Sequence, residues 1–261
     1  MIKPLWAYRG FIFGSVKREF QTKYRNTMFG VAWNVVQPLA MITVYTVIFA
    51  GVMRAKLPGV ESTLGYSIYL CSGILTWGIF AEITTRAQNM FLDNANLLKK
   101  LSFPRLCLPV IVVINALLNY AIVFGLFTSF LIVSGNFSGF PFIALLPIMA
   151  LLVTFAAGLG IVLGILNVFF RDVGQFFGIF ITFWFWLTPI VYPANILPPD
   201  IKPFLTWNPM AGILAAVQGI VVNGYWPKWE SLAYSLAFTL VLCLLGLWLF
   251  RKHAGEIIDE L

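Results

Sequence analysis

Charged residues inside apolar stretches are the first candidates for chemistry in this sequence. Glu82 and Arg86 lie one helical turn apart. Arg171 and Asp172 stand side by side between two long stretches that contain no Asp, Glu, Lys or Arg. The first spacing predicts an i,i+4 ion pair, which more often neutralises itself than performs catalysis. The single histidine, His253, follows the last apolar run, and we expect it to be a solvated tail residue.

No catalytic or nucleotide-binding motif accompanies these charges. The sequence lacks the Gly-x-x-x-x-Gly-Lys-Ser/Thr motif with which P-loop proteins bind nucleotide phosphates. Cys71, Cys107 and Cys243 each lie within or beside an apolar run, at no metal-ligand spacing. We therefore expect buried free thiols rather than a disulfide or a metal site, and no metal or other cofactor bound by this chain.

The composition indicates that lipid is the solvent of this chain. Of 261 residues, 60% are hydrophobic and 10% are charged, whereas a soluble domain has about 25% charged residues. The net charge of +7 more often reflects cytoplasmic loops than nucleic-acid binding in such a chain. We therefore predict an all-α polytopic, multi-pass membrane protein of the inner-membrane type, with no nucleic-acid partner.

Neither end of the sequence predicts a further module. Basic residues and Glu19 interrupt the first twenty residues before an apolar core of a cleavable signal could form. The last apolar run is followed by a short tail that ends at Leu261, so we expect no soluble module that selects a substrate.

Six spanning helices are predicted from the charge-free runs. Runs of about 20 apolar residues can cross a bilayer, and they occur at 26–53, 62–81, 106–170, 173–199, 203–227 and 231–250. The longest run breaks at 134–141, whose Gly, Asn, Ser and Pro residues form a turn, so it supplies two helices near 106–133 and 141–169. The run 203–227 is interrupted by Pro and amide residues and is the doubtful one.

The distribution of basic residues indicates whether the run 203–227 crosses the membrane. If 203–227 does not cross, thirteen Lys and Arg residues share the side of both termini, and only Arg54, Lys56, Lys202 and Lys228 lie opposite. This arrangement satisfies the positive-inside rule, so both termini are expected to be cytoplasmic. We therefore predict that 195–227 forms re-entrant short helices on the external side, between the fifth and sixth spans.

Arg171 and Asp172 then mark a tight cytoplasmic turn between the fourth and fifth spans. Arg171 would complement the dipole of the helix that ends there. Asp172 with Gln175 fits a capping box that opens the next helix. A contact with a partner is the alternative role, and the two are compatible.

Two further cytoplasmic segments are predicted to be amphipathic. In 4–29, apolar residues recur at helical spacing among Lys and Arg, which favours a helix lying in the membrane interface over a simple basic anchor. In 93–105, Asp93 or Asn94 would cap a short helix with apolar Leu97, Leu98 and Leu101, and Pro104 would end it.

Aromatic and glycine residues are the remaining features. Phe183, Trp184, Phe185, Trp186 and Tyr192 crowd one short segment, as a sugar-stacking surface, an apolar gate or an interfacial belt. Glycines four residues apart, at 160 and 164 and at 174 and 178, permit close helix contacts.

Four stretches resemble one family in their order along the chain. They are KYRNTMFGVAWNVVQPL (23–39), NANLLKKLSFPRLCLPV (94–110), LNVFFRDVGQF (166–176) and TPIVYPANILPPDIKPFLTWNPM (188–210). Together they are similar to the membrane subunit of ABC-2-type polysaccharide exporters, the permeases for O-antigen and related lipid-linked glycans. The resemblance covers nearly the whole chain, as one domain over residues 1–261.

The resemblance implies partners and roles for residues. Two identical copies would form a channel for a polyprenyl-linked glycan, and each would bind a separate nucleotide-binding ATPase subunit that holds ATP and Mg. Residues 4–29 would flank the route of the glycan, 93–105 would be the coupling helix on the ATPase, and 195–227 would form gate helices. The expected coupling residues are Leu97, Lys99, Lys100, Arg105, Arg171 and Asp172. The expected channel residues are Trp33, Phe183, Trp184, Trp186 and Tyr192.

The sequence therefore predicts a non-enzymatic permease subunit that exports a lipid-linked polysaccharide, with O-antigen favoured. Capsule or teichoic-acid-type polymers, and a small lipid or drug, are the alternatives within transport. A membrane transferase is disfavoured because no catalytic cluster is present. A purely structural scaffold would tolerate replacement of the channel aromatics by Leu.

Overall fold

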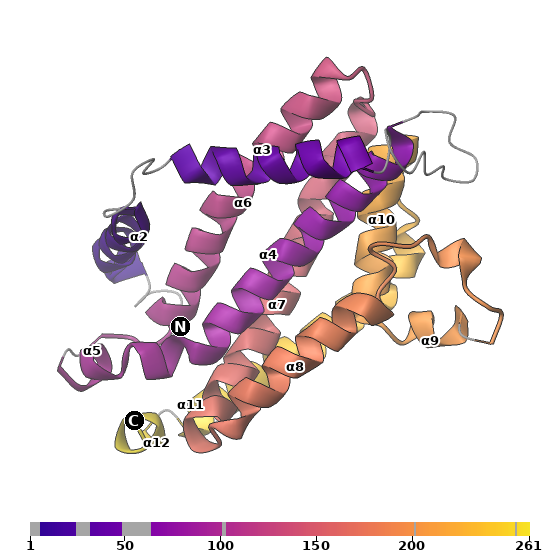
Figure 1. Ribbon diagram of the computed structural model, residues 1–261. Coiled ribbons are helices and arrows are strands. Elements are labelled where there is room, and N and C mark those ends of the chain that lie inside the picture. Colours follow the sequence, from indigo (N-terminus) through magenta and orange to yellow (C-terminus); the bar gives the residue numbers. More distant parts are fainter. Residues whose placement is uncertain (1–5, 25–31, 49–63, 101–102, 201, 254) are drawn as a thin grey trace.

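The computed structural model of this chain describes residues 6–24, 32–48, 64–100, 103–200, 202–253 and 255–261, and every regular element among them is a helix (Figure 1). In the described part of the chain, four helices are long and apolar enough to cross a membrane. They are α4 (Gly65–Asp93), α6 (Cys107–Val133), α7 (Leu145–Phe169) and α11 (Ala233–His253). The predicted all-helical polytopic class is confirmed.

Shorter helices complete the bundle. They are α2 (Arg9–Tyr24), α3 (Trp33–Tyr45), α5 (Ala95–Lys100), α8 (Asp172–Leu187), α9 (Lys202–Thr206), α10 (Pro209–Asn223) and α12 (Glu256–Asp259). Short 3-10 turns are η3 (Phe140–Ala144), η4 (Ala194–Ile196) and η5 (Trp229–Leu232), of which η3 runs into α7 and η5 into α11. At 1.5 Å per residue, α8 is about 24 Å long, less than the hydrocarbon core of about 30 Å. The count of six crossings stays a prediction.

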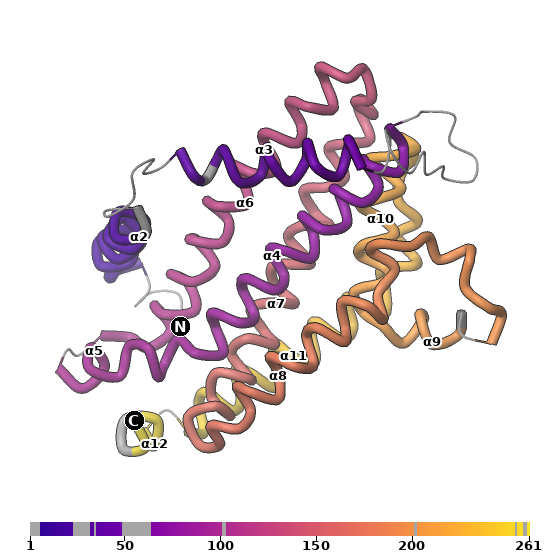
Figure 2. Tube along the Cα trace, in the orientation of Figure 1, coloured from indigo at the N-terminus to yellow at the C-terminus, as the bar shows by residue number. Residues whose placement is uncertain are grey.

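The two ends of the bundle carry different elements. α5, α12 and the start of α8 lie at one end, whereas the α6–α7 turn, α9 and α10 lie at the other (Figures 1 and 2). The predicted break at 134–141 is confirmed by its backbone: Gly135 and Gly139 both have a φ of 71°, which favours glycine over residues with a Cβ. The chain therefore reverses sharply between α6 and α7.

Helix α4 occupies the middle of the bundle and packs against α6, α7 and α10. The stacked rings of Phe80 and Phe155, whose centroids are 5.3 Å apart, join α4 to α7 in the core. Only 28% of the residues in the apolar stretch of α6, and 28% of those in the apolar stretch of α11, are buried. Because lipid tails are as apolar as these side chains, their exposed faces suit lipid or a second protein surface.

Two glycines of α7 allow this helix to lie directly on α4. A Cβ at Gly160 would be 2.5 Å from the Cβ of Ala87, and a Cβ at Gly164 would be 2.7 Å from the Ala87 carbonyl oxygen. The glycine pattern predicted to permit close helix contact is therefore confirmed for this pair. Gly178, in contrast, has nothing within 4 Å of the position of a Cβ.

The segment 195–227 contains a pair of short helices, as predicted, with its break at Asn208. Pro209 occupies the first turn of α10, and the Asn208 side chain accepts a hydrogen bond from the Met210 N–H at 3.0 Å. Gly224, with a φ of 67°, ends the helix. α10 is largely buried against α4, α7 and α11. The external, re-entrant placement of the pair stays a prediction.

The close α4–α7 contact yields a prediction about stability. Gly160→Ala should lower the free energy of unfolding of the detergent-solubilised protein by about 1–3 kcal/mol, because the new methyl group overpacks the interface. Gly178→Ala is the matched control and should be neutral or stabilising by up to about 1 kcal/mol, because alanine is the better helix former. Equal unfolding midpoints for the two variants would contradict the observed packing.

Candidate functional sites

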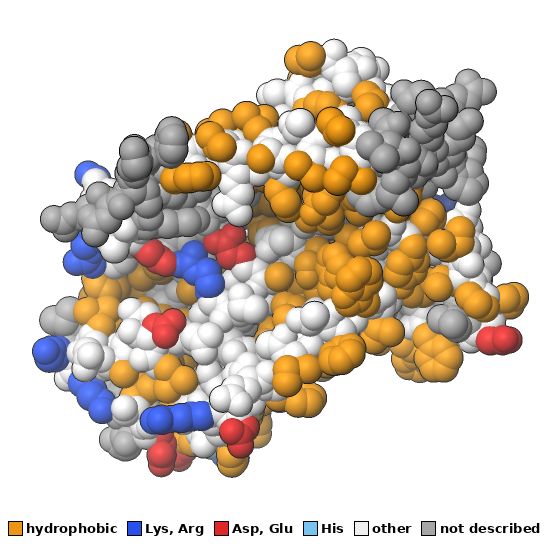
Figure 3. All heavy atoms as spheres, in the orientation of Figure 1, with side chains coloured by type: hydrophobic (Ala, Val, Ile, Leu, Met, Phe, Trp, Pro, Cys, Tyr) orange, Lys and Arg blue, Asp and Glu red, His pale blue; other side chains and the backbone are white. Residues whose placement is uncertain are grey.

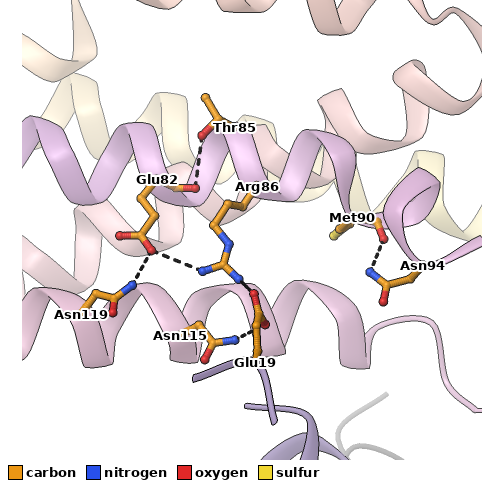
Figure 4. Close-up of polar contacts among 8 residues, drawn as sticks. All are labelled: Glu19, Glu82, Thr85, Arg86, Met90, Asn94, Asn115 and Asn119. Atoms are coloured by element: carbon orange, nitrogen blue, oxygen red, sulfur yellow. Dashed lines mark hydrogen bonds and ion pairs between the residues drawn. The ribbon is translucent and has the colours of Figure 1, made fainter. Parts of the chain in front are cut away.

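A network of charged and amide side chains joins α2, α4 and α6 in the half of the bundle nearer α5. Arg86 of α4 donates to Glu82 with an Nη1–Oε1 distance of 3.3 Å, so the predicted i,i+4 ion pair is confirmed. Its Nη2 also contacts the carboxylate of Glu19 on α2 (Figure 4). One guanidinium is therefore shared by two carboxylates from different helices.

Two asparagines of α6 complete the network. Asn119 donates to Glu82 Oε1 at 2.7 Å, and Asn115 donates to the other carboxylate, that of Glu19 (Figure 4). The amide donors offset the surplus negative charge, because hydrogen bonds to a carboxylate stabilise its ionised form. Sequence reasoning missed Glu19, Asn115 and Asn119. Their only signal was the i,i+4 spacing of two asparagines in a run without charges.

The network lies between cavities and is half-buried. The side chains of Arg86, Glu19 and Glu82 are 29%, 47% and 30% exposed. A cavity of about 460 Å³ opens on these residues and both asparagines. A second, of about 430 Å³, extends past Arg18 toward α5. The geometry holds α2 against the bundle, together with Ile12 and Val16, which are buried against α6.

Among the described residues, no group of three His, Cys, Asp or Glu side chains lies close enough to hold a metal ion. Arg86, Glu19 and Glu82 form ion pairs with one another. These observations describe a polar network that joins three helices.

The residues expected to contact a partner surround one end of the bundle. Lys99 and Lys100 are exposed in the last turn of α5, whereas Leu97 and Arg105 are partly buried. Figure 3 shows most of the visible charged side chains on the side of the bundle where α2, α5 and α12 lie, while hydrophobic side chains predominate on the opposite side.

The cap predicted for α5 is different in the structure. Asp93 belongs to the last turn of α4, and the Asn94 side chain donates back to the Met90 carbonyl oxygen at 2.8 Å (Figure 4). The Asn94 amide therefore serves the end of α4 rather than the start of α5. Leu101, expected on the apolar face of α5, lies outside the described residues.

The α7–α8 turn places Arg171 and Asp172 side by side and exposed, as the sequence indicated. The predicted capping box of Asp172 and Gln175 is wrong. Arg171 occupies the N-cap position of α8 and makes no side-chain capping hydrogen bond. Instead, Asn167 in the last turn of α7 accepts a hydrogen bond from the Gly174 N–H at 3.0 Å.

Asn167 is the centre of a buried amide network that joins three helices. Its side chain donates to the Gln88 carbonyl oxygen and to Asn89 Oδ1, each at 3.1 Å. The Gln88 side chain donates in turn to the Gly174 carbonyl oxygen at 3.1 Å. Because each such group is costly to bury alone, this network defines how α4, α7 and the start of α8 fit together.

At the other end of α8, Trp184 is partly buried and packs against the core. Its ring meets Phe80 edge-on, with centroids 5.2 Å apart. Its Nε1 donates to Asn208 Oδ1 at 2.9 Å, and Asn208 Nδ2 donates to Thr188 Oγ1 at 2.9 Å. Trp184 therefore ties the end of α8 to the start of α10.

The other aromatic residues predicted to line the channel lie in different parts of the bundle. Phe183 and Trp186 are 64% and 60% exposed on the opposite face of α8. Tyr192 donates to the Trp186 carbonyl oxygen at 2.8 Å. Trp184 and Tyr192 border an apolar groove of about 800 Å³. Trp33, on α3, borders a different cavity of about 280 Å³ together with Glu82 and Asn119.

A bundle of apolar helices with one charged end defines this chain as a polytopic membrane protein. Residues 12–222 match the family model described as ABC-2 type transporter, and the chain belongs to that family. The resemblance drawn from the four sequence stretches is thereby confirmed.

Curated relatives cover most of the chain. The O-antigen export system permease protein RfbA of Klebsiella pneumoniae is 30% identical over 90% of this chain and 88% of its own length. The protein of the same name from Myxococcus xanthus is 27% identical over 100% and 99%. The polysialic acid transport protein KpsM of Escherichia coli is 24% identical over 90% of both chains.

The charged network yields a prediction about coupled residues. Arg86→Gln should destabilise the protein more than Glu19→Gln, because it leaves two carboxylates facing each other without their cation. The double variant, Arg86→Gln with Glu19→Gln, should lose less free energy of unfolding than the two single variants lose in total. The difference, the coupling energy, should be about 0.5–3 kcal/mol. Unfolding of each variant in detergent measures this coupling.

The matched control for this cycle is Arg86→Gln combined with Glu230→Gln, since Glu230 is exposed in η5, outside the network. These two effects should add. Additive effects for Arg86 and Glu19 as well would show that the ion pair contributes nothing to stability.

Proposed function

We propose that this chain is the membrane-spanning permease subunit of an ABC transporter that exports a lipid-linked polysaccharide, with O-antigen as the first candidate. The observation that carries the proposal is the similarity to O-antigen export permeases over nearly the full length of both chains. A chain of polytopic helices with a charged end supports it.

Energy for export comes, in this proposal, from a separate nucleotide-binding ATPase subunit. Membership of the ABC-2 family supports such a partner, and the sequence has no P-loop of its own. ATP and Mg would bind to that subunit. This chain would bind no cofactor and would act as a channel rather than as an enzyme.

The proposed topology has six crossings, both termini in the cytoplasm of a bacterium, and the protein in the inner membrane. α3 and α8 would be the first and fifth crossings. α8 is shorter than the hydrocarbon core, which the bilayer accommodates by local thinning or by oligomerisation at modest cost. α9 and α10 would form the external gate, and α2 would lie at the cytoplasmic interface beside the route of the polyprenyl-linked glycan.

A homodimer would complete the channel. Phe183 and Trp186 lie with Phe176 and Ile179 on one exposed face of α8, at a spacing typical of a helix surface that meets a partner or a pore. In this arrangement Phe183 and Trp186 face the glycan path, whereas Trp184 supports α8 from behind. Tyr192 and Trp33 would border the path at its two ends.

One observation favours a second substrate class. The similarity to a polysialic acid transport protein extends over 90% of both chains, so a capsule-type polymer is the next candidate. The O-antigen permeases rank first because their identity is higher, at 27–30% against 24%.

A strain that lacks this chain tests the proposal directly. Long lipid-linked polymer should accumulate inside the cell while surface polysaccharide disappears, because synthesis continues without export. Extraction of lipid-linked glycans and sugar analysis would measure the accumulation and identify the substrate class. Normal surface polysaccharide would contradict the proposal and leave a small lipid or drug as the exported molecule.

Charge reversal on α5 tests the proposed coupling role. Lys99→Glu with Lys100→Glu should weaken association with the ATPase subunit at least tenfold and abolish export, because both lysines are exposed in the last turn of α5. The matched control, Lys202→Glu with Lys228→Glu, reverses two charges on the predicted external side and should leave association unchanged. Export at the wild-type level by the α5 variant would show that residues 93–105 do not couple this chain to the ATPase subunit.

A further inference from the structure

The C-terminal helix α12 folds back against α5. Figure 2 shows both helices at the same end of the bundle, and they are in contact. Ile257 is fully buried in a cluster with Leu98 of α5 and with residues from α4, α6, α7 and α11. A helix of four residues is not stable by itself. The burial of Ile257 is therefore what holds α12 in place.

His253, the last residue of α11, is predicted from the sequence to be solvated, but its side chain is only 25% exposed in the structure. His253 Nδ1 contacts the Glu256 carboxylate, and the His253 ring lies edge-on to Phe169 with centroids 5.3 Å apart. Phe169 ends α7, two residues before Arg171. α12 is thereby connected to the α7–α8 turn as well as to α5, the two elements to which the sequence assigned partner contacts.

The charges on α5 and α12 are opposite in sign. Lys99 and Lys100 are exposed on α5, and Glu256 and Glu260 are exposed at the two ends of α12. No ion pair joins these lysines to these glutamates in the described part of the chain. A surface of mixed sign fits a protein with complementary charges. It suits an anionic lipid surface poorly, because the glutamates would be repelled.

We propose that α5 and α12 form one docking surface for the nucleotide-binding subunit, with Ile257 as the positioning residue that joins them. This inference rests on the proposed function. α5 alone has a single buried side chain, Leu98, so a force on α5 by itself would tilt this short helix. Because Ile257 and Leu98 share a cluster with Phe91 of α4 and Phe250 of α11, a partner seated on both short helices moves two long helices together.

The test uses the full chain, purified with its nucleotide-binding subunit in lipid nanodiscs. Ile257→Ser should lower the affinity for the subunit at least tenfold and reduce glycan-stimulated ATP hydrolysis to the same extent. The matched control is Ile132→Ser, because Ile132 is 59% exposed in the last turn of α6, at the opposite end of the bundle. This control should leave affinity and hydrolysis unchanged.

A second variant keeps the proposal falsifiable where Ile257→Ser fails to fold. Glu256→Lys with Glu260→Lys alters exposed side chains only, and it should weaken binding of the subunit at least threefold at low salt. The matched reversal at the other end is Asp200→Lys with Glu230→Lys, which should have no effect. Wild-type affinity for the α12 charge variant, or for a folded Ile257→Ser protein, overturns the proposal. A wild-type chain that binds no nucleotide-binding subunit overturns instead the proposed function itself.

Discussion

The direct contact between α4 and α7 is the constraint on which the rest of the structure depends. The absence of side chains at Gly160 and Gly164 brings the α7 backbone onto Ala87, and in lipid such close packing replaces the hydrophobic effect as the source of helix association. On one side of this contact lie the stacked Phe80 and Phe155 rings. On the other lie the amide hydrogen bonds of Asn167. Helices α6, α8, α10 and α11 each pack against α4 or α7.

Polar groups in this bundle fix helix positions that apolar packing alone does not determine. A hydrophobic face can slide along or rotate against another with little penalty in lipid, whereas an unpaired amide or charge is expensive there. Arg86 meets its second carboxylate only when α2 lies in one place beside α6. Asn167 can accept a hydrogen bond from the Gly174 N–H only when the start of α8 lies next to the end of α7. These interactions therefore fix register and orientation more than they supply stability.

Local sequence patterns predicted the structural features that depend on residues close together in the chain. Gly135 and Gly139 marked the turn, and the i,i+4 spacing predicted the Glu82–Arg86 pair. Interactions between distant segments had no such signal. Glu19 lies 67 residues from Arg86, and no periodicity connects them. The capping box failed because it assumed that a helix supplies its own cap, whereas the acceptor comes from the preceding helix. The coupling and channel roles stay predictions, since both depend on surfaces that meet other chains.

Helix α8 shows how these constraints combine. At its start, Asn167 of α7 accepts the Gly174 N–H, and at its end Asn208 accepts the Trp184 indole N–H and donates to Thr188. Between these two anchors one face packs against the core through Phe177 and Trp184, and the other carries exposed aromatic side chains. A short helix held by an asparagine at each end cannot tilt without breaking one set of hydrogen bonds. Movement of α8 must therefore carry the α7–α8 turn or α10 with it, which links the two ends of the bundle through one rigid element.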